Sequence, residues 1–285
     1  MTLRELYRAG RERLLQAGIE SASFDARLLL EHHALLPRYV DVADGEKPAP
    51  DAMILAFQKD IERRALHTPL QYLLGKWEFL GLPFAVGDGV LIPRPETELL
   101  CETAAALTAS IPSPVCLDLC SGSGCVAIGV AHLCPGAQVT AVERSQEAFE
   151  YLTRNIAQND CGERVSPICA DLFAYADAVQ DAAFDLITAN PPYLTDADMQ
   201  ALQPEVQREP AMALAGGGDG LYFYRGIVPL YLSKLAPGGF FAFEVGIGQA
   251  DAVAGILEDC GLSNTTARTD LGGIARVVCG QKMRA

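Results

Sequence analysis

A regular alternation of strand-like and helix-like segments from Val115 onward constrains the fold more than any other feature of this chain. Six apolar runs have the composition of strands: "VCLDLC", "AQVTAVE", "RVSPICAD", "FDLITAN", "GFFAFEVG" and "ARVVCG". Helical patterns separate most of them: "GCVAIGVAHLC", "SQEAFEYLTRNIAQN" with Ser145 as its expected N-cap, a helix around 222–236 and "QADAVAGILEDCG". Repeated strand–helix units predict an α/β fold with a mostly parallel sheet and helices on both faces.

The segment before this alternation has a different pattern. "LRELYRAGRERLLQAG", "SFDARLLLEHHALL" and "DAMILAFQKDIERRAL" carry apolar residues at helical spacing, and a connector with proline and glycine occupies residues 37–50. Residues 76–92 combine β-prone residues with glycines, which suggests a hairpin. We therefore expect a helical domain over 1–75, a β-hairpin linker over 76–92 and the α/β domain over 93–285.

Composition and charge restrict the possible environments and partners. No apolar run is long enough to span a bilayer, and the first residues lack the apolar core of a signal peptide, so we expect a soluble, cytoplasmic protein without membrane contact. Nine cysteines without a CxxC pair and four scattered histidines indicate reduced thiols and no metal site. A net charge of −14 disfavours nucleic acid as a partner, because that affinity comes mainly from Lys and Arg.

A glycine-rich turn, "LDLCSGSGC" at 117–125, joins the first strand of the alternating region to its helix. Glycines there let the backbone approach a ligand closely, but such a turn alone is weak evidence for one. Glu143 ends the next strand about 20 residues further on, a spacing suited to hydrogen bonds with ribose hydroxyls. Asp171 ends the third strand and is either an adenine contact or a helix cap. The turn and Glu143 favour a nucleoside-containing cofactor and leave NAD and S-adenosylmethionine open.

The tetrapeptide Asn190–Tyr193, "NPPY", follows the fourth strand and decides between these cofactors. Two prolines stop the strand, since neither donates to a sheet ladder, and an amide and an aromatic ring are thereby set at its end. That is the edge of an open α/β sheet where ligands bind. A dinucleotide enzyme has no evident use for this tetrapeptide, whereas a methyltransferase that acts on an amino group does.

The series from the glycine turn through Glu143 and Asp171 to "NPPY" resembles the S-adenosylmethionine-dependent methyltransferases that modify a planar NH₂ group. Further segments narrow the resemblance: "HTPLQYLLG", "PRPETE" at 93–98, "EPAMALAGGGDGLYFYR" at 209–225, "FEVGIGQ" at 243–249 and "DLGGIAR" at 270–276. Together they are similar to the protein-(glutamine-N5) methyltransferases of peptide chain release factors, the PrmC/HemK family, over nearly the whole chain.

The resemblance implies a fold, an activity and a set of site residues. The fold is a Rossmann-like methyltransferase domain with a seven-stranded, mostly parallel sheet, preceded by a helical domain that recognises the release factor. The activity is methylation of N5 of the glutamine in the Gly-Gly-Gln motif of release factors, with S-adenosyl-L-methionine as methyl donor, and we expect a monomer. The implied cofactor-binding residues are Cys120, Ser121, Gly122, Ser123, Gly124, Glu143, Asp171, Leu172 and Asn190. The implied substrate-binding residues are Asn190, Pro191, Pro192 and Tyr193, with Asn190, Pro191 and Tyr193 in catalysis.

Three positions depart from the family pattern. Cys120 stands where many relatives have glycine, and Glu143 where many have aspartate. Leu172 stands where some relatives have an aromatic residue near adenine, which affects only the expected adenine contact.

The chemistry explains why these residue types are suited to the reaction. An amide nitrogen is a poor nucleophile because its lone pair is delocalised into the carbonyl. The Asn190 side-chain oxygen and the Pro191 carbonyl can accept its two N–H protons and localise that lone pair. Tyr193 can lie against the flat amide and exclude water. No general base is assigned, since the nitrogen becomes acidic once it is methylated.

Two other functions remain as alternatives. A DNA or RNA amino-methyltransferase can use the same tetrapeptide to hold the amino group of a base, but it needs a basic face and a flipped base. A binding protein that keeps the fold without catalysis is disfavoured by the intact Asn190 and glycine turn.

Overall fold

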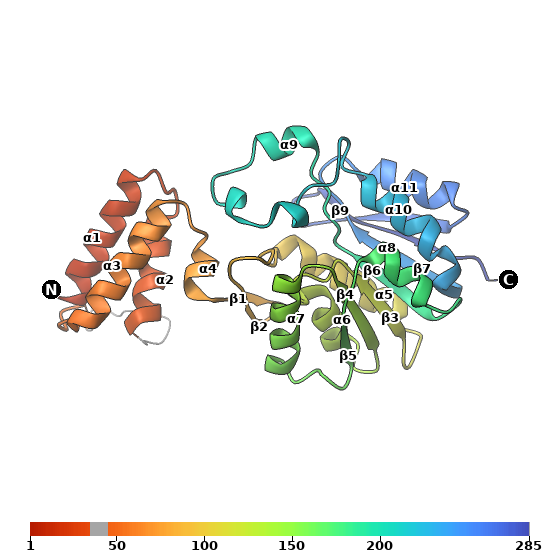
Figure 1. Ribbon diagram of the computed structural model, residues 1–285, viewed down its shortest axis with the longest axis horizontal. Helices are drawn as coiled ribbons and strands as arrows, with labels where there is room; N and C mark the ends of the chain where they lie inside the picture. Colours follow the sequence, from red (N-terminus) through yellow and green to blue (C-terminus); the bar gives the residue numbers. More distant parts are fainter. Residues whose placement is uncertain (35–44, 285) are drawn as a thin grey trace. The chain divides into compact units, whose positions relative to one another are not determined.

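A computed structural model of the chain describes residues 1–34 and 45–284 (Figure 1). Residues 37–44 of the expected connector lie outside the described residues. The chain forms two compact units. The helical unit comprises Met1–Lys76 together with Gln203–Arg208, and the α/β unit comprises Trp77–Leu202 together with Glu209–Ala285. The sequence did not indicate that a six-residue segment from the α/β region joins the helical unit.

The helical unit contains α1 (Leu3–Gln16), α2 (Ala22–Ala34), α3 (Asp51–Ala65) and α4 (Leu70–Leu74). Helix α1 begins with a capping box in which Thr2 and Glu5 each accept the other's backbone N–H. Apolar side chains of α1, α2 and α3 form the core: Leu6, Leu14, Leu29, Leu30, Phe57 and Ile61. No helix in the described parts of the chain combines the length and apolar character needed to cross a membrane.

A partly buried ion pair between Arg64 and Glu205 joins the segment Gln203–Arg208 to these helices. Arg64 on α3 donates from Nε to Asp25 Oδ2 of α2 at 2.7 Å and from a terminal nitrogen to Glu205 Oε1 at 2.9 Å. His67 Nδ1 lies 3.0 Å from the same Glu205 oxygen, and Arg208 donates to the Leu66 carbonyl. The two acids offset the charge of Arg64, which would be costly to bury alone.

The hairpin strands β1 (Lys76–Phe79) and β2 (Leu82–Ala85) lie at the start of the α/β unit, which takes up the chain at Trp77. Its remaining strands are β3 (Val115–Leu119), β4 (Gln138–Glu143), β5 (Val165–Cys169), β6 (Phe184–Ala189), β7 (Leu235–Glu244), β8 (Ser263–Thr269) and β9 (Ala275–Gln281). Its α-helices are α5 (Glu98–Thr108), α6 (Cys125–Leu133), α7 (Gln146–Gln158), α8 (Leu172–Tyr175), α9 (Asp196–Gln200), α10 (Tyr222–Tyr231) and α11 (Ala250–Asp259).

Strands β3 to β9 form one seven-stranded sheet in the order β5-β4-β3-β6-β7-β9-β8. The first five of these are parallel, and β9 is antiparallel to both β7 and β8. This confirms the expected mostly parallel seven-stranded sheet. Strand β8, "SNTTART", was not identified from the sequence, and the helix expected around 222–236 ends earlier, because β7 begins at Leu235.

The sheet separates two hydrophobic clusters, as the α/β pattern predicts. On one face, α5, α6 and α7 pack with the hairpin residues Phe79 and Phe84. On the other face, α8, α10 and α11 cover the sheet, with buried aromatic side chains at Tyr224, Phe241 and Phe243. Figure 1 shows these helices on opposite sides of the central strands.

Asn155 on α7 joins three segments of the α/β unit. Its side chain is fully buried; Oδ1 accepts from Ala85 N at 2.6 Å, and Nδ2 donates to the carbonyls of Ala85 and Ser123 at 3.1 and 2.9 Å. Asn155 thus links the hairpin to the glycine-rich turn. Ser145 caps the same helix by accepting from Ala148 N, as predicted.

We expect Asn155→Ala to lower the free energy of unfolding by about 2–4 kcal/mol, because it leaves buried backbone groups without hydrogen-bond partners. Urea denaturation followed by fluorescence of Trp77, the single tryptophan and a residue of β1, measures this change. Gln158→Ala is the matched control, since Gln158 on the same helix makes an exposed bond to the Pro83 carbonyl of the same hairpin. Equal stability of the two variants would show that Asn155 does not hold these segments.

Candidate active site

The reversal of strand order at β3 places two chain segments at one edge of the sheet. Strand β3 pairs with β4 on one side and with β6 on the other. The chain therefore adds β4 and β5 on one side of β3, and then β6 and β7 on the other side. Leu119 is the partner of Ala189 in the β3–β6 register, and Cys120 and Asn190 follow directly after them. Ligands of open α/β sheets bind at such switch points, outside the carboxyl ends of the strands.

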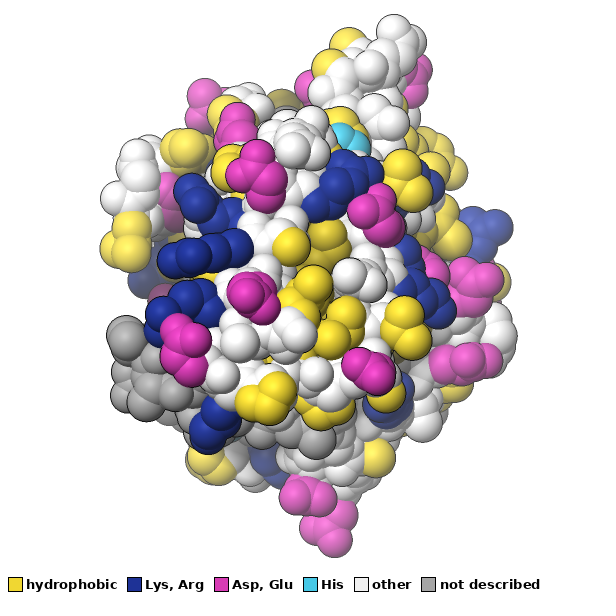
Figure 2. Space-filling model, turned by 90° about the vertical axis from the view of Figure 1, so that its left-hand side faces the viewer, with side chains coloured by type: hydrophobic (Ala, Val, Ile, Leu, Met, Phe, Trp, Pro, Cys, Tyr) yellow, Lys and Arg dark blue, Asp and Glu magenta, His cyan; other side chains and the backbone are white. Residues whose placement is uncertain are grey.

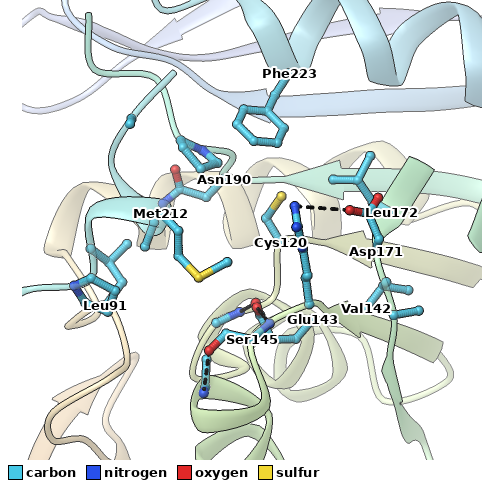
Figure 3. Close-up of a pocket in the computed structure, with 18 of the residues that line it drawn as sticks. Leu91, Cys120, Val142, Glu143, Ser145, Asp171, Leu172, Asn190, Met212 and Phe223 are labelled. Carbon is cyan, nitrogen blue, oxygen red and sulfur yellow. Dashed lines mark hydrogen bonds and ion pairs between the residues drawn. The ribbon is translucent and has the colours of Figure 1, made fainter. Parts of the chain in front are cut away.

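A pocket of about 270 Å³ lies at this edge. Seven of the residues expected from the sequence line it: Cys120, Gly122, Glu143, Asp171, Leu172, Asn190 and Pro192. The other five expected residues are not among its described lining residues: Ser121, Ser123, Gly124, Pro191 and Tyr193. Figure 3 shows Cys120, Glu143, Asp171 and Asn190 approaching the pocket from four different strand ends.

The glycine-rich turn has a left-handed backbone at alternate residues. Cys120 has a φ of +58°, Gly122 of +54° and Gly124 of +85°. A side chain costs roughly 1–2 kcal/mol in this region, which explains why glycine suits the position that Cys120 occupies. A Cβ built on Gly122 would meet no protein atom within 4 Å, so the turn leaves bare backbone beside the pocket. Ser121 and Ser123 are buried and support the turn.

Glu143, at the end of β4, is held in place by the backbone on either side of it. Its Oε2 accepts from Gly122 N at 2.8 Å and its Oε1 from Ser145 N at 2.7 Å. The residue is 8% exposed and lines the pocket. A carboxylate has about four acceptor sites, so Glu143 keeps two for the hydroxyl groups of a ligand.

Asp171 follows β5 and caps α8, with Oδ1 accepting from Phe173 N at 2.8 Å. Its Oδ2 forms an ion pair with Arg144 at 3.2 Å (Figure 3). Leu172 lines the pocket beside it, together with Phe173 and Phe223, whose rings stack 6.2 Å apart. The structure therefore supplies aromatic surface from these two neighbouring residues although Leu172 is aliphatic.

The tetrapeptide leaves β6 in a well-supported conformation. Pro191 and Pro192 are buried, and Asn190 Nδ2 donates to Thr97 Oγ1 at 3.3 Å. The Tyr193 ring turns toward β7, where its hydroxyl donates to Glu244 Oε1 at 3.3 Å. The Tyr193 carbonyl accepts from Gln249 Nε2 at 2.9 Å. Burial next to a carboxylate raises the pKa of the Tyr193 hydroxyl, so this group stays protonated as a donor.

A glycine in the "GGGDG" segment allows the loop at 209–221 to lie against the tetrapeptide. A Cβ on Gly216 would lie 2.6 Å from Tyr193 Cα and 2.8 Å from the Pro192 oxygen, so only glycine fits there. Gly216 N donates to the Leu194 carbonyl at 2.8 Å, and Leu194 N donates to Leu214 at 2.9 Å. This contact places the pocket-lining residues of the loop: Pro210, Met212, Ala213 and Ala215.

The "PRPETE" segment is fixed to the same loop by a nearly buried acid. Glu209 is 6% exposed, accepts from Ile92 N at 3.0 Å and forms an ion pair with Arg94. From the sequence, both segments served only as motifs of the family resemblance. The sequence did not indicate Leu91, Met212, Phe173 or Phe223 as lining residues.

Asp118 on β3 is a second buried carboxylate at this end of the sheet. It is 1% exposed, and its Oδ1 accepts from the Thr188 hydroxyl at 2.8 Å. No group in the described ranges hydrogen bonds to its Oδ2. Burial raises the pKa of Asp118 to about 7.

The pocket therefore has two distinct halves. One half offers carboxylates at two adjacent strand ends, bare glycine backbone and aromatic surface, which fit a nucleoside. The other half offers a neutral amide, Asn190, whose side chain makes a hydrogen bond through nitrogen. The protein can hold a nucleoside-containing ligand next to a group that accepts hydrogen bonds.

Comparison with known proteins agrees with this geometry. A family model described as "PrmC N-terminal domain" matches residues 5–75, and one described as "Conserved hypothetical protein 95" matches residues 74–216. A release factor glutamine methyltransferase of Geobacter sulfurreducens is 41% identical over 281 residues, which cover 98% of this chain and 96% of that protein. One of Caulobacter vibrioides is 34% identical over 283 residues, with 99% and 97% covered.

Solved structures agree on the fold. The crystal structure of a methyltransferase from Pyrococcus furiosus matches with a TM-score of 0.53 at 19% identity, over 72% of this chain and 91% of that one. This similarity confirms the expected Rossmann-like methyltransferase fold. The identity to relatives over nearly the whole chain shows that this protein belongs to the release factor glutamine methyltransferase family, the PrmC/HemK family that its motifs resemble.

Proposed function

We propose that this protein transfers a methyl group from S-adenosyl-L-methionine to N5 of the glutamine in the Gly-Gly-Gln motif of peptide chain release factors. The observation that carries the proposal is the juxtaposition of Asn190 with the glycine turn at the carboxyl ends of β3 and β6. Membership of the family supports the reaction and the substrate.

The nucleoside half of the pocket fits the methyl donor. Glu143 would hold the ribose hydroxyls through its two remaining acceptor sites, and Gly122 would let the backbone lie close to the donor. Asp171, Leu172 and the two phenylalanines would border the adenine. When bound, S-adenosylmethionine supplies an electrophilic methyl group on a positively charged sulfur.

The acceptor amide would be held by Asn190 and Pro191. With Nδ2 of Asn190 bonded to Thr97, Oδ1 is the atom of that amide left to accept one N–H of the substrate. The Pro191 carbonyl would accept the other, which localises the nitrogen lone pair. Tyr193 and Pro192 would limit the access of water. Holding the reacting groups in this arrangement can lower the barrier by several kcal/mol, up to about 7–11 in well-oriented systems.

Proton transfer needs no dedicated base in this scheme. The amide nitrogen gains the methyl group and becomes acidic, and its surplus proton leaves to solvent. Before methyl transfer, Asn190 and Pro191 would accept hydrogen bonds from the two N–H hydrogens of this amide nitrogen. We therefore assign them binding and orienting roles rather than acid–base roles.

The helical unit is proposed to hold the release factor. Residues 1–76 contain eleven of the 22 Lys and Arg residues and eleven of the 36 Asp and Glu residues, so the whole net charge of −14 belongs to residues 77–285. On the face shown in Figure 2, hydrophobic side chains gather in the middle, with charged side chains of both signs around them. Phe24, Leu55 and Leu66 of this unit are 46%, 69% and 64% exposed. Exposed apolar groups with a charged rim are typical of protein–protein contacts.

The substrate is tested directly by mass spectrometry. We expect a release factor incubated with this protein and S-adenosylmethionine to gain one methyl group on the Gly-Gly-Gln glutamine. A duplex and a single-stranded oligonucleotide are incubated in parallel and should gain none, because the α/β unit carries the entire net negative charge. Methylated adenine or cytosine in the oligonucleotides, with an unmodified release factor, would reverse the assignment.

The role of Asn190 is tested by Asn190→Ala. We expect transfer to fall at least about 100-fold, since the acceptor amide loses one of its two partners, whereas cofactor affinity falls less than about tenfold. Single-turnover assays and calorimetric titration with the cofactor measure the two effects. Gln146→Ala, on α7 outside the described pocket lining, should leave both unchanged. Near-normal turnover of Asn190→Ala would show that the hydrogen bond between the acceptor amide and Asn190 is unnecessary.

A further inference from the structure

The segment "FEVGIGQ" at 243–249 has no role in the function proposed above. It runs from the end of β7 to Gln249, which occupies the N-cap position of α11. N-cap residues are usually Ser, Thr, Asp or Asn, whose side chains accept hydrogen bonds from the first N–H groups of the helix. Within the described residues, the Gln249 side chain makes no such bond. Helix capping therefore does not account for a glutamine at this position.

Both polar atoms of the Gln249 side-chain amide are hydrogen bonded, which fixes the orientation of that amide. Its Oε1 accepts from Gly246 N at 2.9 Å, and its Nε2 donates to the Tyr193 carbonyl at 2.9 Å. The Gln249 backbone N–H also donates to the Gly246 carbonyl, at 3.1 Å, and closes a tight turn. An amide turned the other way would set its NH₂ group against the Gly246 N–H and its oxygen against the Tyr193 carbonyl. The Tyr193 carbonyl is therefore bound by a donor with a fixed direction.

Two glycines lie directly against this hydrogen bond. A Cβ on Gly220 would overlap the Tyr193 carbonyl oxygen and Gln249 Nε2. A Cβ on Gly246 would lie 2.8 Å from Gln249 Oε1. A side chain at either position would press on the Gln249 amide, so glycine is needed at both for this close approach. The segments "GGGDG" and "FEVGIGQ" thus both depend on glycine where they pack around the bond from Gln249 to Tyr193.

The carbonyl that Gln249 binds belongs to the peptide group between Tyr193 and Leu194. The nitrogen of the same peptide group, Leu194 N, donates to the Leu214 carbonyl at 2.9 Å. Both polar atoms of this peptide group are therefore hydrogen bonded, one to a side chain at the start of α11 and the other to the loop at 209–221. The Tyr193 hydroxyl adds a third contact, with Glu244.

The tetrapeptide is held at its two ends and is stiff between them. At one end, Ala189 is the last residue of β6 and pairs with both β3 and β7. At the other end, the Tyr193 carbonyl is bound by Gln249. Pro191 and Pro192, in between, have φ angles fixed by their rings, and neither has an N–H group to donate to a neighbouring segment. The direction of the Pro191 carbonyl, on which the proposed function relies, therefore depends on how the Tyr193 end is held.

We propose that Gln249 is a positioning residue that holds the Tyr193 carbonyl and thereby directs the Pro191 carbonyl toward the acceptor amide of the substrate. Gln249 is not among the described lining residues of the pocket, so its effect passes through the tetrapeptide. The proposal rests on the function proposed above and adds a residue that this function needs. All the groups involved belong to the α/β unit.

Two substitutions of Gln249 test the proposal in the full-length protein. Gln249→Glu keeps the size of the side chain and its accepting oxygen, but it replaces the NH₂ donor that faces the Tyr193 carbonyl with a second acceptor. Gln249→Met keeps the length without the amide. Gln281→Glu is the matched control, because Gln281 Nε2 also donates to a backbone carbonyl, that of Gly238, at 2.9 Å. That bond lies near the start of β7, whereas Gln249 follows the end of β7.

The kinetic readout is kcat with a release factor as substrate, together with the cofactor Kd from calorimetry. At about pH 8, we expect both Gln249 variants to lower kcat about 10- to 100-fold, because the Pro191 carbonyl is no longer directed at the acceptor amide. The cofactor Kd should change less than about threefold, since Gln249 is not among the described lining residues of the pocket. Gln281→Glu should stay close to the wild type in both measurements.

The pH profile separates positioning from a general loss of structure. As the pH falls, the carboxyl group introduced by Gln249→Glu gains a proton and with it an O–H donor for the Tyr193 carbonyl. The kcat of this variant relative to the wild type should therefore rise between about pH 8 and about pH 5, whereas the ratio for Gln249→Met should stay constant. Glu244, Arg276 and Arg94 lie within electrostatic range of Tyr193 and are present in every variant, so the ratio removes their own titration. A ratio that stays flat for Gln249→Glu would contradict the proposal.

A second readout does not depend on activity. Exchange of the Leu194 N–H with deuterium, followed by NMR on the whole protein, reports how firmly the peptide group bound by Gln249 is held. We expect this exchange to be at least about tenfold faster in both Gln249 variants than in the wild type or in Gln281→Glu. A normal kcat in Gln249→Met, or Leu194 exchange that does not depend on Gln249, would overturn the proposal. A wild type that modifies no release factor, with Leu194 exchange still dependent on Gln249, would refute the proposed function and support the anchoring of the tetrapeptide.

Discussion

Parallel pairing of β3 with β6 is the interaction on which the site depends. Because Leu119 lies opposite Ala189, the glycine turn and the tetrapeptide leave the sheet side by side, although they are about 70 residues apart in the chain. The pairing of β4 with β3 and β5 brings Glu143 and Asp171 to the same edge. A shift of one residue in either register would turn the side chains at these strand ends to the opposite face. The hydrophobic clusters on both faces, with fully buried Leu117 and Ile187, hold the register.

Segments outside the sheet also form part of the site. Glu209 joins the "PRPETE" segment to the loop at 209–221, and Gly216 lets that loop lie against Tyr193. Gln249 fixes the Tyr193 carbonyl from the start of α11. Two further acids near the carboxyl ends of the strands, Asp118 and Glu244, are buried, and burial raises the pKa of each to about 7. The proposed methyl donor would carry its positive charge at this edge of the sheet.

Much of this arrangement could be predicted from the sequence, for physical reasons that differ between elements. The inner strands are continuous apolar runs bounded by glycine and proline, so their existence and the chemistry at their ends were evident. Strand β8 is an edge strand with a polar, largely exposed sequence, and within residues 1–34 and 45–284 it pairs only with β9, so no apolar pattern marked it. The segment Gln203–Arg208 joins the helical unit through an ion pair 141 residues apart, and the Thr97–Asn190 bond spans 93 residues. Local patterns carry no information about such pairings. Tyr193 is expected at the acceptor amide, and this stays a prediction; the structure shows its hydroxyl bonded to Glu244, and Tyr193 is not among the described lining residues of the pocket.

The central claim is that Asn190 and Pro191 together hold the two hydrogens of the acceptor amide. A crystal structure of this protein with a release factor and the demethylated cofactor product tests it most directly. The account predicts the glutamine nitrogen at about 3 Å from both Asn190 Oδ1 and the Pro191 carbonyl oxygen, with Asn190 Nδ2 still bonded to Thr97. A glutamine bound away from these two oxygens, or facing Asn190 Nδ2, would contradict it.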